Sequence, residues 1–194
     1  MTTRIADTTA GGEPRAGRSA APGWPAAHAG IGGDDFRTLM RHHPTGVALI
    51  TADPGDGPVA LTATSLVSLS ADPPLIAFSL SELSSATPSL RRSSTFVIHL
   101  LSEEELELAR LGATSGVDRF ADSSSWARLE TGEPYFVRPS VRMRAQAANS
   151  LSAGTSVLVV AHVLDAVMAV SPQRKPLVYL GRTWFAFGDD AKVG

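Results

Sequence analysis

Apolar and hydroxyl-bearing residues alternate along much of this chain, and a period of two predicts β-strands. Within 58–70, Leu61 and Leu69 fall on one face of the expected strand, while Thr62 and Ser68 fall on the other. Shorter apolar runs bounded by Gly, Pro, Asp or Ser predict further strands. In all, strands are expected over 46–52, 58–70, 75–80, 95–101, 140–148, 156–166, 176–180 and 183–187.

Turn residues connect these segments in pairs. Asp53-Pro54-Gly55-Asp56-Gly57 separates the first two expected strands, and Gly181-Arg182 separates the last two. Because neighbouring strands then pair with each other, the sheet should be antiparallel. A closed or partly closed barrel would hide its edge strands, so the fold class expected is mainly β, with short flanking helices.

Helical spacing is confined to short segments. Apolar residues recur at a helical period over 34–43, and Pro44 should end that helix. Ser102 and Glu105 have the spacing of a capping box at the start of a second helix. That helix should end at Gly112, as a C-cap. The Ser-rich segment 81–94 is expected to be irregular, with one helical turn.

The N-terminal part of the chain differs in composition from the rest. Residues 1–32 are rich in Ala, Gly, Pro, Thr and Arg and almost lack large apolar side chains. Such a segment buries too little surface to offset its ordering entropy, so it is expected to be a disordered tail. Residues 33–190 are expected to form one domain.

Composition excludes several kinds of function. The chain of 194 residues has no Cys, so disulfides and thiolate sites are excluded. Its formal net charge is -2. No basic block suggests nucleic acid, and no apolar run reaches the roughly 18 residues of a membrane span. The five His have no metal-ligand spacing, so no metal is expected. The sequence contains no known catalytic motif, so no catalytic residue is named. The absence of Cys fits a reducing compartment, and a cytoplasmic location is expected.

Two segments are dense in hydroxyl groups. One is the expected strand segment 62–70, with candidate ligand contacts at Thr62, Thr64 and Ser65; the other is the segment 79–87. Hydroxyls and free backbone N–H groups in a loop suit a phosphate, and a strand edge suits a flat heterocycle. The pattern is also compatible with structure alone, because Thr favours strands and Ser is common in loops.

Several short motifs, in order along the chain, resemble the flavin reductase-like family between about residues 35 and 187. They are Phe36-Arg37 with Pro44-Thr45-Gly46-Val47-Ala48, Leu61-Thr62-Ala63-Thr64-Ser65-Leu66, Ser68-Leu69-Ser70-Ala71-Asp72-Pro73-Pro74-Leu75, Phe96-Val97-Ile98-His99-Leu100-Leu101-Ser102, Ala109-Arg110-Leu111, Asp118-Arg119-Phe120 and Pro176-Leu177-Val178-Tyr179. The resemblance implies an FMN-binding split barrel with Greek-key strand order, and a homodimer with the flavin near the subunit interface.

The resemblance also implies where a flavin would lie. Thr64 and Ser65 match the strand that lines the isoalloxazine ring. The other matching residues are Ser79, Leu80 and Ser81 at the next strand edge, Ser84, Ser85 and Ala86 in the loop around the ribityl phosphate, and Arg110 near that phosphate. Arg110 could equally be a solvated helix residue. His99 stands where the family usually has Asn, and either packs in the core or contacts the flavin.

The implied activity is reduction of FMN or FAD by NADH or NADPH, with the reduced flavin passed to a partner monooxygenase. Gly154-Thr155-Ser156 stands where the family usually has Gly-Asp-His near the nicotinamide, and Leu61 replaces a usual Gly. These departures leave two alternatives open. One is a flavin-dependent oxygenase or tailoring enzyme that does not use NAD(P)H, and the other is a non-catalytic flavin-binding module.

Overall fold

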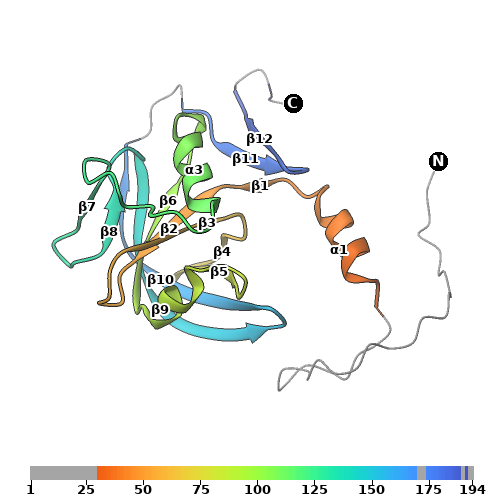
Figure 1. The fold of residues 1–194 in the computed structure, drawn as a ribbon, viewed down its shortest axis with the longest axis horizontal. Helices are drawn as coiled ribbons and strands as arrows, with labels where there is room; N and C mark the ends of the chain where they lie inside the picture. The colour runs from red at the N-terminus through yellow and green to blue at the C-terminus, as the bar shows by residue number, and fades with distance from the viewer. Residues whose placement is uncertain (1–29, 170–173, 189–190, 192–194) are drawn as a thin grey trace.

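The structure is a computed structural model that describes residues 30–169, 174–188 and 191. Apart from 30–32, the expected N-terminal tail lies outside the described residues, as do 189–190 at the end of the expected domain. The described part is mostly β-strand, arranged as one large sheet with two small ones (Figure 1). This confirms the mainly β fold class.

The large sheet has seven strands in the order β3-β2-β6-β9-β10-β5-β4, and every neighbouring pair is antiparallel. The strands are β2 (Ala48–Ala52), β3 (Val59–Ala63), β4 (Val67–Ala71), β5 (Pro74–Ser81), β6 (Thr95–Leu100), β9 (Val141–Ala153) and β10 (Ser156–Met168). The hairpin predicted around residues 53–57 is confirmed, because β2 pairs with β3.

The order of the strands requires the sheet to curl into a barrel. Strands β3 and β4 lie at opposite edges of the sheet, yet only residues 64–66 separate them. Such a link spans about 14 Å at most, whereas the edges of a flat seven-stranded sheet would lie about 29 Å apart. The sheet therefore rolls up until β3 contacts β5. Among the described strands β3 and β4 are not paired, so the barrel is split at residues 64–66.

This split corrects the prediction of one strand over 58–70. The alternation of apolar and hydroxyl residues continues across the break, so the pattern gave no sign of it. The chain leaves the sheet at Thr64 and returns at Val67, because β4 pairs with β5 on the far edge and not with β2.

Two small sheets flank the barrel. Strands β1 (Thr45–Gly46), β11 (Leu177–Leu180) and β12 (Thr183–Ala186) form one, and β11 and β12 make the predicted terminal hairpin. The other consists of β7 (Trp126–Arg128) and β8 (Pro134–Phe136).

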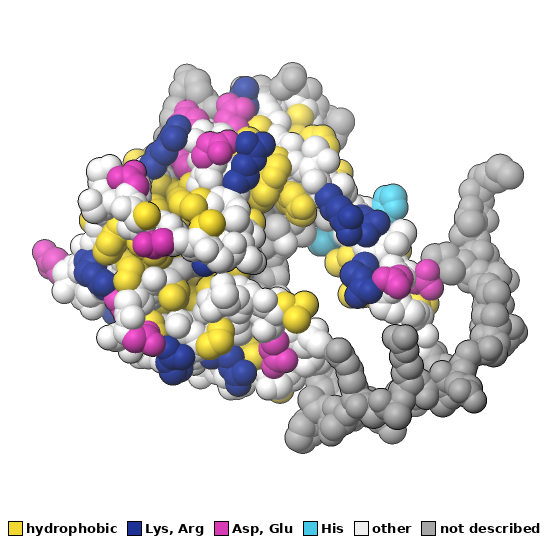
Figure 2. Space-filling model, in the orientation of Figure 1, with side chains coloured by type: hydrophobic (Ala, Val, Ile, Leu, Met, Phe, Trp, Pro, Cys, Tyr) yellow, Lys and Arg dark blue, Asp and Glu magenta, His cyan; other side chains and the backbone are white. Residues whose placement is uncertain are grey.

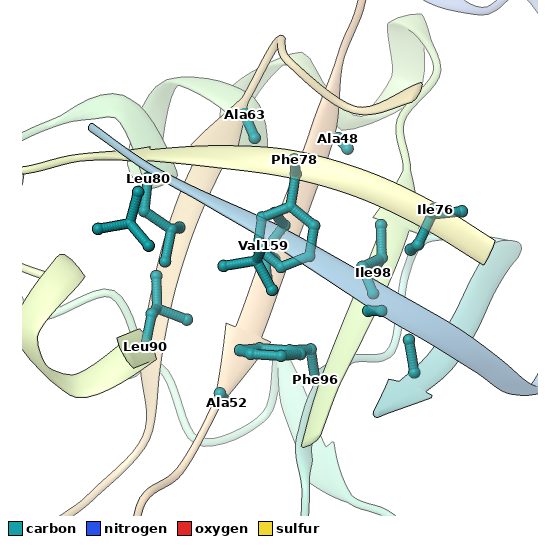
Figure 3. Close-up of a cluster of buried hydrophobic side chains, with 14 of the residues drawn as sticks. Ala48, Ala52, Ala63, Ile76, Phe78, Leu80, Leu90, Phe96, Ile98 and Val159 are labelled. Carbon is teal, nitrogen blue, oxygen red and sulfur yellow. The ribbon is translucent and has the colours of Figure 1, made fainter. Parts of the chain in front are cut away.

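The interior of the barrel is a single apolar cluster (Figure 3). Phe78 of β5 meets Phe96 of β6 edge to face, with ring centroids 5.4 Å apart. A second cluster, which includes Leu49 and Ala109, lies between the barrel and the helix that follows β6. Apolar side chains are therefore packed on both sides of strand β2.

The helices are short: α1 (Gly33–Met40), α2 (Thr87–Arg92), the 3-10 turn η1 (Glu103–Glu105) and α3 (Leu106–Ala113). Helix α1 ends three residues before the predicted limit, and none of its residues is buried. The capping box is confirmed, since the Glu105 carboxylate accepts from both the backbone N–H and the hydroxyl of Ser102.

The prediction that Gly112 caps helix α3 is wrong. The helix runs to Ala113, and Thr114 is its C-cap. A Cβ on Gly112 would lie 2.3 Å from both Leu49 Cδ1 and Thr62 Oγ1. Gly112 therefore lets α3 approach β2 and β3 closely, which is a packing role that the sequence pattern could not distinguish from capping.

Candidate functional site

The two hydroxyl-rich segments meet at the split of the barrel. Ser65, in the link between β3 and β4, accepts a hydrogen bond from the backbone N–H of Ser79 at 2.9 Å. Its hydroxyl in turn lies 3.3 Å from the Ser79 carbonyl oxygen. Because β4 pairs with β5 only up to Ala77, Ser65 occupies the edge of β5 that β4 has left. The sequence prediction that these segments share a site is compatible with this contact.

The loop after β5 is ordered by its own hydroxyl groups. Thr87 donates to the Ser81 carbonyl at 2.6 Å, and the N–H of Ser84 donates to the same oxygen at 3.0 Å. The N–H of Ala86 donates to the Ser84 hydroxyl at 3.3 Å. Ser85 is exposed and makes no hydrogen bond with any described residue.

Ser85 and Ala86 line a cavity of about 190 Å³ together with Val59 at the start of β3, Asp118 and Arg119; the Asp118 carboxylate accepts from the N–H of Phe120 at 2.9 Å. Arg119 donates from Nη2 to the Thr114 carbonyl at 2.6 Å. Its Nε is buried and has no hydrogen-bond partner among the described residues. Burial lowers the pKa of Arg119 from its ordinary value. A guanidinium group in this state favours an anionic ligand.

Arg119 is a candidate ligand contact that the sequence reasoning missed. The motif Asp118-Arg119-Phe120 was a signal for it, but nothing in the sequence placed that motif beside Ser85. Arg110, the arginine predicted near the phosphate, forms an exposed ion pair with Glu107 at 2.6 Å. It does not line the cavity that contains Ser85, Ala86 and Arg119.

Two other predicted contacts have side chains that are engaged elsewhere. The Thr62 hydroxyl donates to the Ala109 carbonyl of α3 at 2.7 Å. The Leu80 side chain is fully buried in the barrel core, although its backbone lies in the strand next to the split (Figure 3). The part that either residue takes in binding a flavin stays a prediction.

Thr64 and Ser65 also line a larger cavity of about 660 Å³. Its other walls are α1, β1 and the turn between β11 and β12. In Figure 2 the molecule is hollowed between the barrel and α1, with blue Arg and cyan His side chains beside the hollow. The cavity is large enough for a planar ring system, and Thr64 and Ser65 are part of its lining.

The turn 154–156 lies beside the same loop. It closes the long hairpin of β9 and β10, where Ser156 pairs with Ser81 across the sheet. The Thr155 carbonyl accepts from the N–H of Glu82 at 3.0 Å. The turn is therefore close to the hydroxyl loop, where the resemblance implies that a nicotinamide would approach, although it has neither a carboxylate nor an imidazole.

His99 is a packed core residue and not a ligand contact. It is fully buried in β6, and burial lowers its pKa to about 4. Its Nδ1 lies 3.0 Å from the Leu49 carbonyl, and the N–H of Phe136 donates to Nε2 at 3.1 Å. The neutral ring thus joins β2, β6 and β8, which decides between the two interpretations of this residue.

The comparison with known domains decides the family. A model described as the flavin reductase-like domain matches residues 40–188. This chain belongs to the flavin reductase-like family. The match covers all of the barrel and both small sheets, so the fold and the family prediction agree.

Three similar proteins show what family members do. An NADH:FMN oxidoreductase from Rhodococcus erythropolis is 42% identical over 136 residues, which are 70% of this chain and 71% of that protein. The reductase component of a 4-nitrophenol 4-monooxygenase from Rhodococcus opacus is 28% identical over 132 residues, 68% of this chain and 70% of that protein.

The third is a solved structure, the NADH:FAD oxidoreductase SgcE6 of Streptomyces globisporus C-1027 in complex with NAD and FAD fragments. It superimposes with a TM-score of 0.73 and 25% identity, covering 82% of this chain and 94% of that one. The likeness in structure confirms the split-barrel fold.

Within the described residues, no helix combines the length and hydropathy that crossing a membrane requires.

Proposed function

We propose that this protein is an NAD(P)H-dependent flavin reductase that reduces FMN or FAD. The observation that carries the proposal is the meeting of Ser65 with Ser79 at the barrel split, beside a cavity of about 660 Å³. The family membership and the NADH:FMN oxidoreductase from Rhodococcus erythropolis support it. The defining test is flavin-dependent oxidation of NADH or NADPH by the purified protein.

The residues of this chain act by binding and orienting. A bound flavin supplies the acceptor for a hydride from the nicotinamide, and this step requires no acid or base from the protein. The Thr64 hydroxyl, which has no hydrogen bond with any described residue, would be free to contact the ring at the split of the barrel and to stabilise negative charge on it. Ser65 would act indirectly, because its hydroxyl is bonded to the Ser79 backbone and so holds the edge of β5 in place. The neighbouring cavity would give the nicotinamide room to approach the flavin. The absence of a catalytic motif in the sequence agrees with this assignment.

The phosphate of the flavin fits the cavity that contains Ser85, Ala86 and Arg119. The guanidinium there carries a buried Nε without a hydrogen-bond partner among the described residues, and Ser85 has free polar groups. A phosphate would accept hydrogen bonds from both the Arg119 guanidinium and Ser85. Its contact with the guanidinium would be charge-assisted, and such hydrogen bonds are the strong ones. This gives to Arg119 the contact that the family resemblance implied for Arg110.

The variant Arg119→Gln is expected to weaken FMN binding by about tenfold to a hundredfold, the loss of one or two charge-assisted hydrogen bonds. Riboflavin, which has the same ring and no phosphate, should bind both proteins equally. Quenching of flavin fluorescence measures both affinities. Arg110→Gln is the matched control and should leave FMN binding unchanged; a larger loss in this control than in Arg119→Gln would overturn the assignment.

A second copy of this chain is proposed to cover α1 and β4. Phe36, Leu39 and Met40 of α1 are 52%, 53% and 44% exposed, and Val67 and Leu69 of the edge strand β4 are 51% and 52% exposed. An open apolar edge strand is prone to pair with another chain, and proteins normally cover it. A homodimer would do so at the larger cavity itself, because Phe36, Met40 and Val67 also contribute to its lining.

Sedimentation equilibrium should give twice the mass of the chain for the wild type. The double variant Phe36→Glu and Leu39→Glu should sediment as a monomer, because it places charges in the proposed interface. A monomeric wild type at all concentrations would contradict the proposal.

Reduced flavin is proposed to serve a separate monooxygenase in the cytoplasm. The 4-nitrophenol 4-monooxygenase relative is a reductase component, which supports such a partner. The location is proposed from the Cys-free composition.

A further inference from the structure

Three arginines contribute to the lining of the larger cavity beside Thr64 and Ser65. Arg37, Arg41, His43 and Arg182 contribute to its lining, and none of the described residues that line it is acidic. Arg37 is paired with Asp34. The side chains of Arg41 and Arg182 make no ion pair or hydrogen bond with any described residue. A concave surface with unpaired charges of one sign concentrates ligands of the opposite sign.

A backbone contact places the two unpaired arginines together. The N–H of Gly181 donates to the Arg41 carbonyl at 3.0 Å, which fastens the turn between β11 and β12 to the end of α1. Arg41 and Arg182 therefore come from distant parts of the sequence and are held at one rim of the cavity. Thr64 and Ser65 are part of the lining of the same cavity.

The backbone at Arg182 is unusual. Gly181 and Arg182 form the two-residue turn between Leu180 and Thr183, with φ of 58° and 68°. Arg182 is the single non-glycine residue with a positive φ in the described part of the chain. Such turns favour Gly or Asn, because a larger side chain is strained there. Arginine is therefore unfavourable at this backbone conformation, and its presence there suggests that the side chain has a functional role.

The flavin phosphate is assigned to another cavity, so Arg41 and Arg182 are available to a different anionic ligand. The cavity with Ser85, Ala86 and Arg119 shares no lining residue with this one. Given the proposed function, on which this step rests, a second phosphate-bearing molecule must bring its ring to the flavin. We propose that Arg41 and Arg182 bind the phosphate groups of the reduced nicotinamide dinucleotide.

The test measures NAD⁺ binding to the FMN-loaded protein by calorimetry. NAD⁺ carries the same diphosphate as NADH and is not turned over by oxidised flavin. Arg182→Gly should weaken NAD⁺ binding by about tenfold, the loss of a charge-assisted contact. FMN affinity should not change, and the melting temperature should stay or rise, because Gly suits this turn. Arg182→Lys should retain most of the affinity, and Arg41→Gln should weaken it as Arg182→Gly does.

Arg138→Gln is the charge-matched control. Arg138 is exposed and lies outside this cavity, so its loss should leave NAD⁺ binding unchanged. In steady-state assays Arg182→Gly should raise KM for NADH by about tenfold with little change in kcat, the result of lost ground-state binding.

Three outcomes would overturn the inference in distinguishable ways. Unchanged NAD⁺ affinity in Arg182→Gly and Arg41→Gln would exclude a phosphate contact from these residues. Weaker binding of FAD with unchanged NAD⁺ and FMN affinity would assign them to the adenylate of FAD instead. A wild-type protein that neither binds NAD⁺ nor oxidises NADH or NADPH would contradict the proposed function itself.

Discussion

Replacement of His99 by Ala is expected to lower the free energy of unfolding by about 4 kcal/mol at neutral pH. The imidazole is fully buried and bridges the Leu49 carbonyl and the Phe136 N–H, at 3.0 Å and 3.1 Å. Removing it leaves both backbone groups without partners in the core, each at a cost of about 1–3 kcal/mol, and opens a cavity. Urea unfolding measures the difference.

The same histidine makes stability depend on pH. Burial lowers its pKa from an ordinary 6.5 to about 4. Between these values the unfolded chain binds a proton that the folded chain does not, so stability falls as the pH falls. The loss is fully developed at about pH 4 and amounts to about 3 kcal/mol. Stability should be insensitive to this group above pH 6.5.

His99→Gln is the matched variant, because an amide keeps a donor and an acceptor but does not titrate. Its unfolding free energy should show a smaller pH slope between pH 6.5 and 5 than that of the wild type. An equal slope in both proteins would contradict the assignment. The ionisation of Glu133 does not contribute to the pH dependence of stability between pH 6.5 and 5. Burial raises its pKa, but hydrogen bonds from Arg144, Thr131 and Thr95 outweigh this and lower it to about 2, so its contribution is lost only below about pH 4.5.

Gly112→Val is expected to cost about 3 kcal/mol of stability, because it forces side-chain atoms into a filled contact. A Cβ there would lie 2.3 Å from Leu49 Cδ1 and Thr62 Oγ1 and 3.1 Å from the Thr62 backbone nitrogen. The Leu49 side chain is fully buried, and the Thr62 hydroxyl donates a hydrogen bond to the Ala109 carbonyl of α3, so neither side chain can move freely. Displacement of β3 should also weaken flavin binding, since this strand leads to Thr64.

Gly46→Val provides the control for that change. A Cβ on Gly46 would meet nothing within 4 Å, and the residue lies in a strand, where valine is favoured. The melting temperatures of Gly112→Val and Gly46→Val compare the effect of the same added side chain in a filled space and in an open one. Equal melting temperatures would show that α3 does not need the close approach.

Local signals in the sequence predicted local structure well. The turn residues 53–57 and the capping box of Ser102 and Glu105 were identified because neighbouring residues determine them. The break at 64–66 was missed because it depends on which strands meet across the barrel, and the alternation of side chains is the same on either side of it.

The candidate site shows the same limit. Thr64, Ser65 and the loop 81–87 could be selected from their hydroxyls and from the family resemblance. The presence of Arg119 and Ser85 in one cavity could not be predicted, because the two residues come together only through the packing of the segment after α3 against β3. The larger cavity was likewise hidden, since Arg41 and Arg182 are far apart in the sequence.

The measurement that tests the central claim is the rate of NADH and NADPH oxidation by the purified protein with FMN or FAD, followed by the absorbance of the reduced nicotinamide. A flavin reductase predicts flavin-dependent oxidation at more than about 1 per second with at least one pair of substrates. Oxidation by neither nucleotide, in a protein that still binds flavin, would contradict it. The site would then hold a flavin for another reaction, and the turn 154–156 would mark the loss of nicotinamide binding.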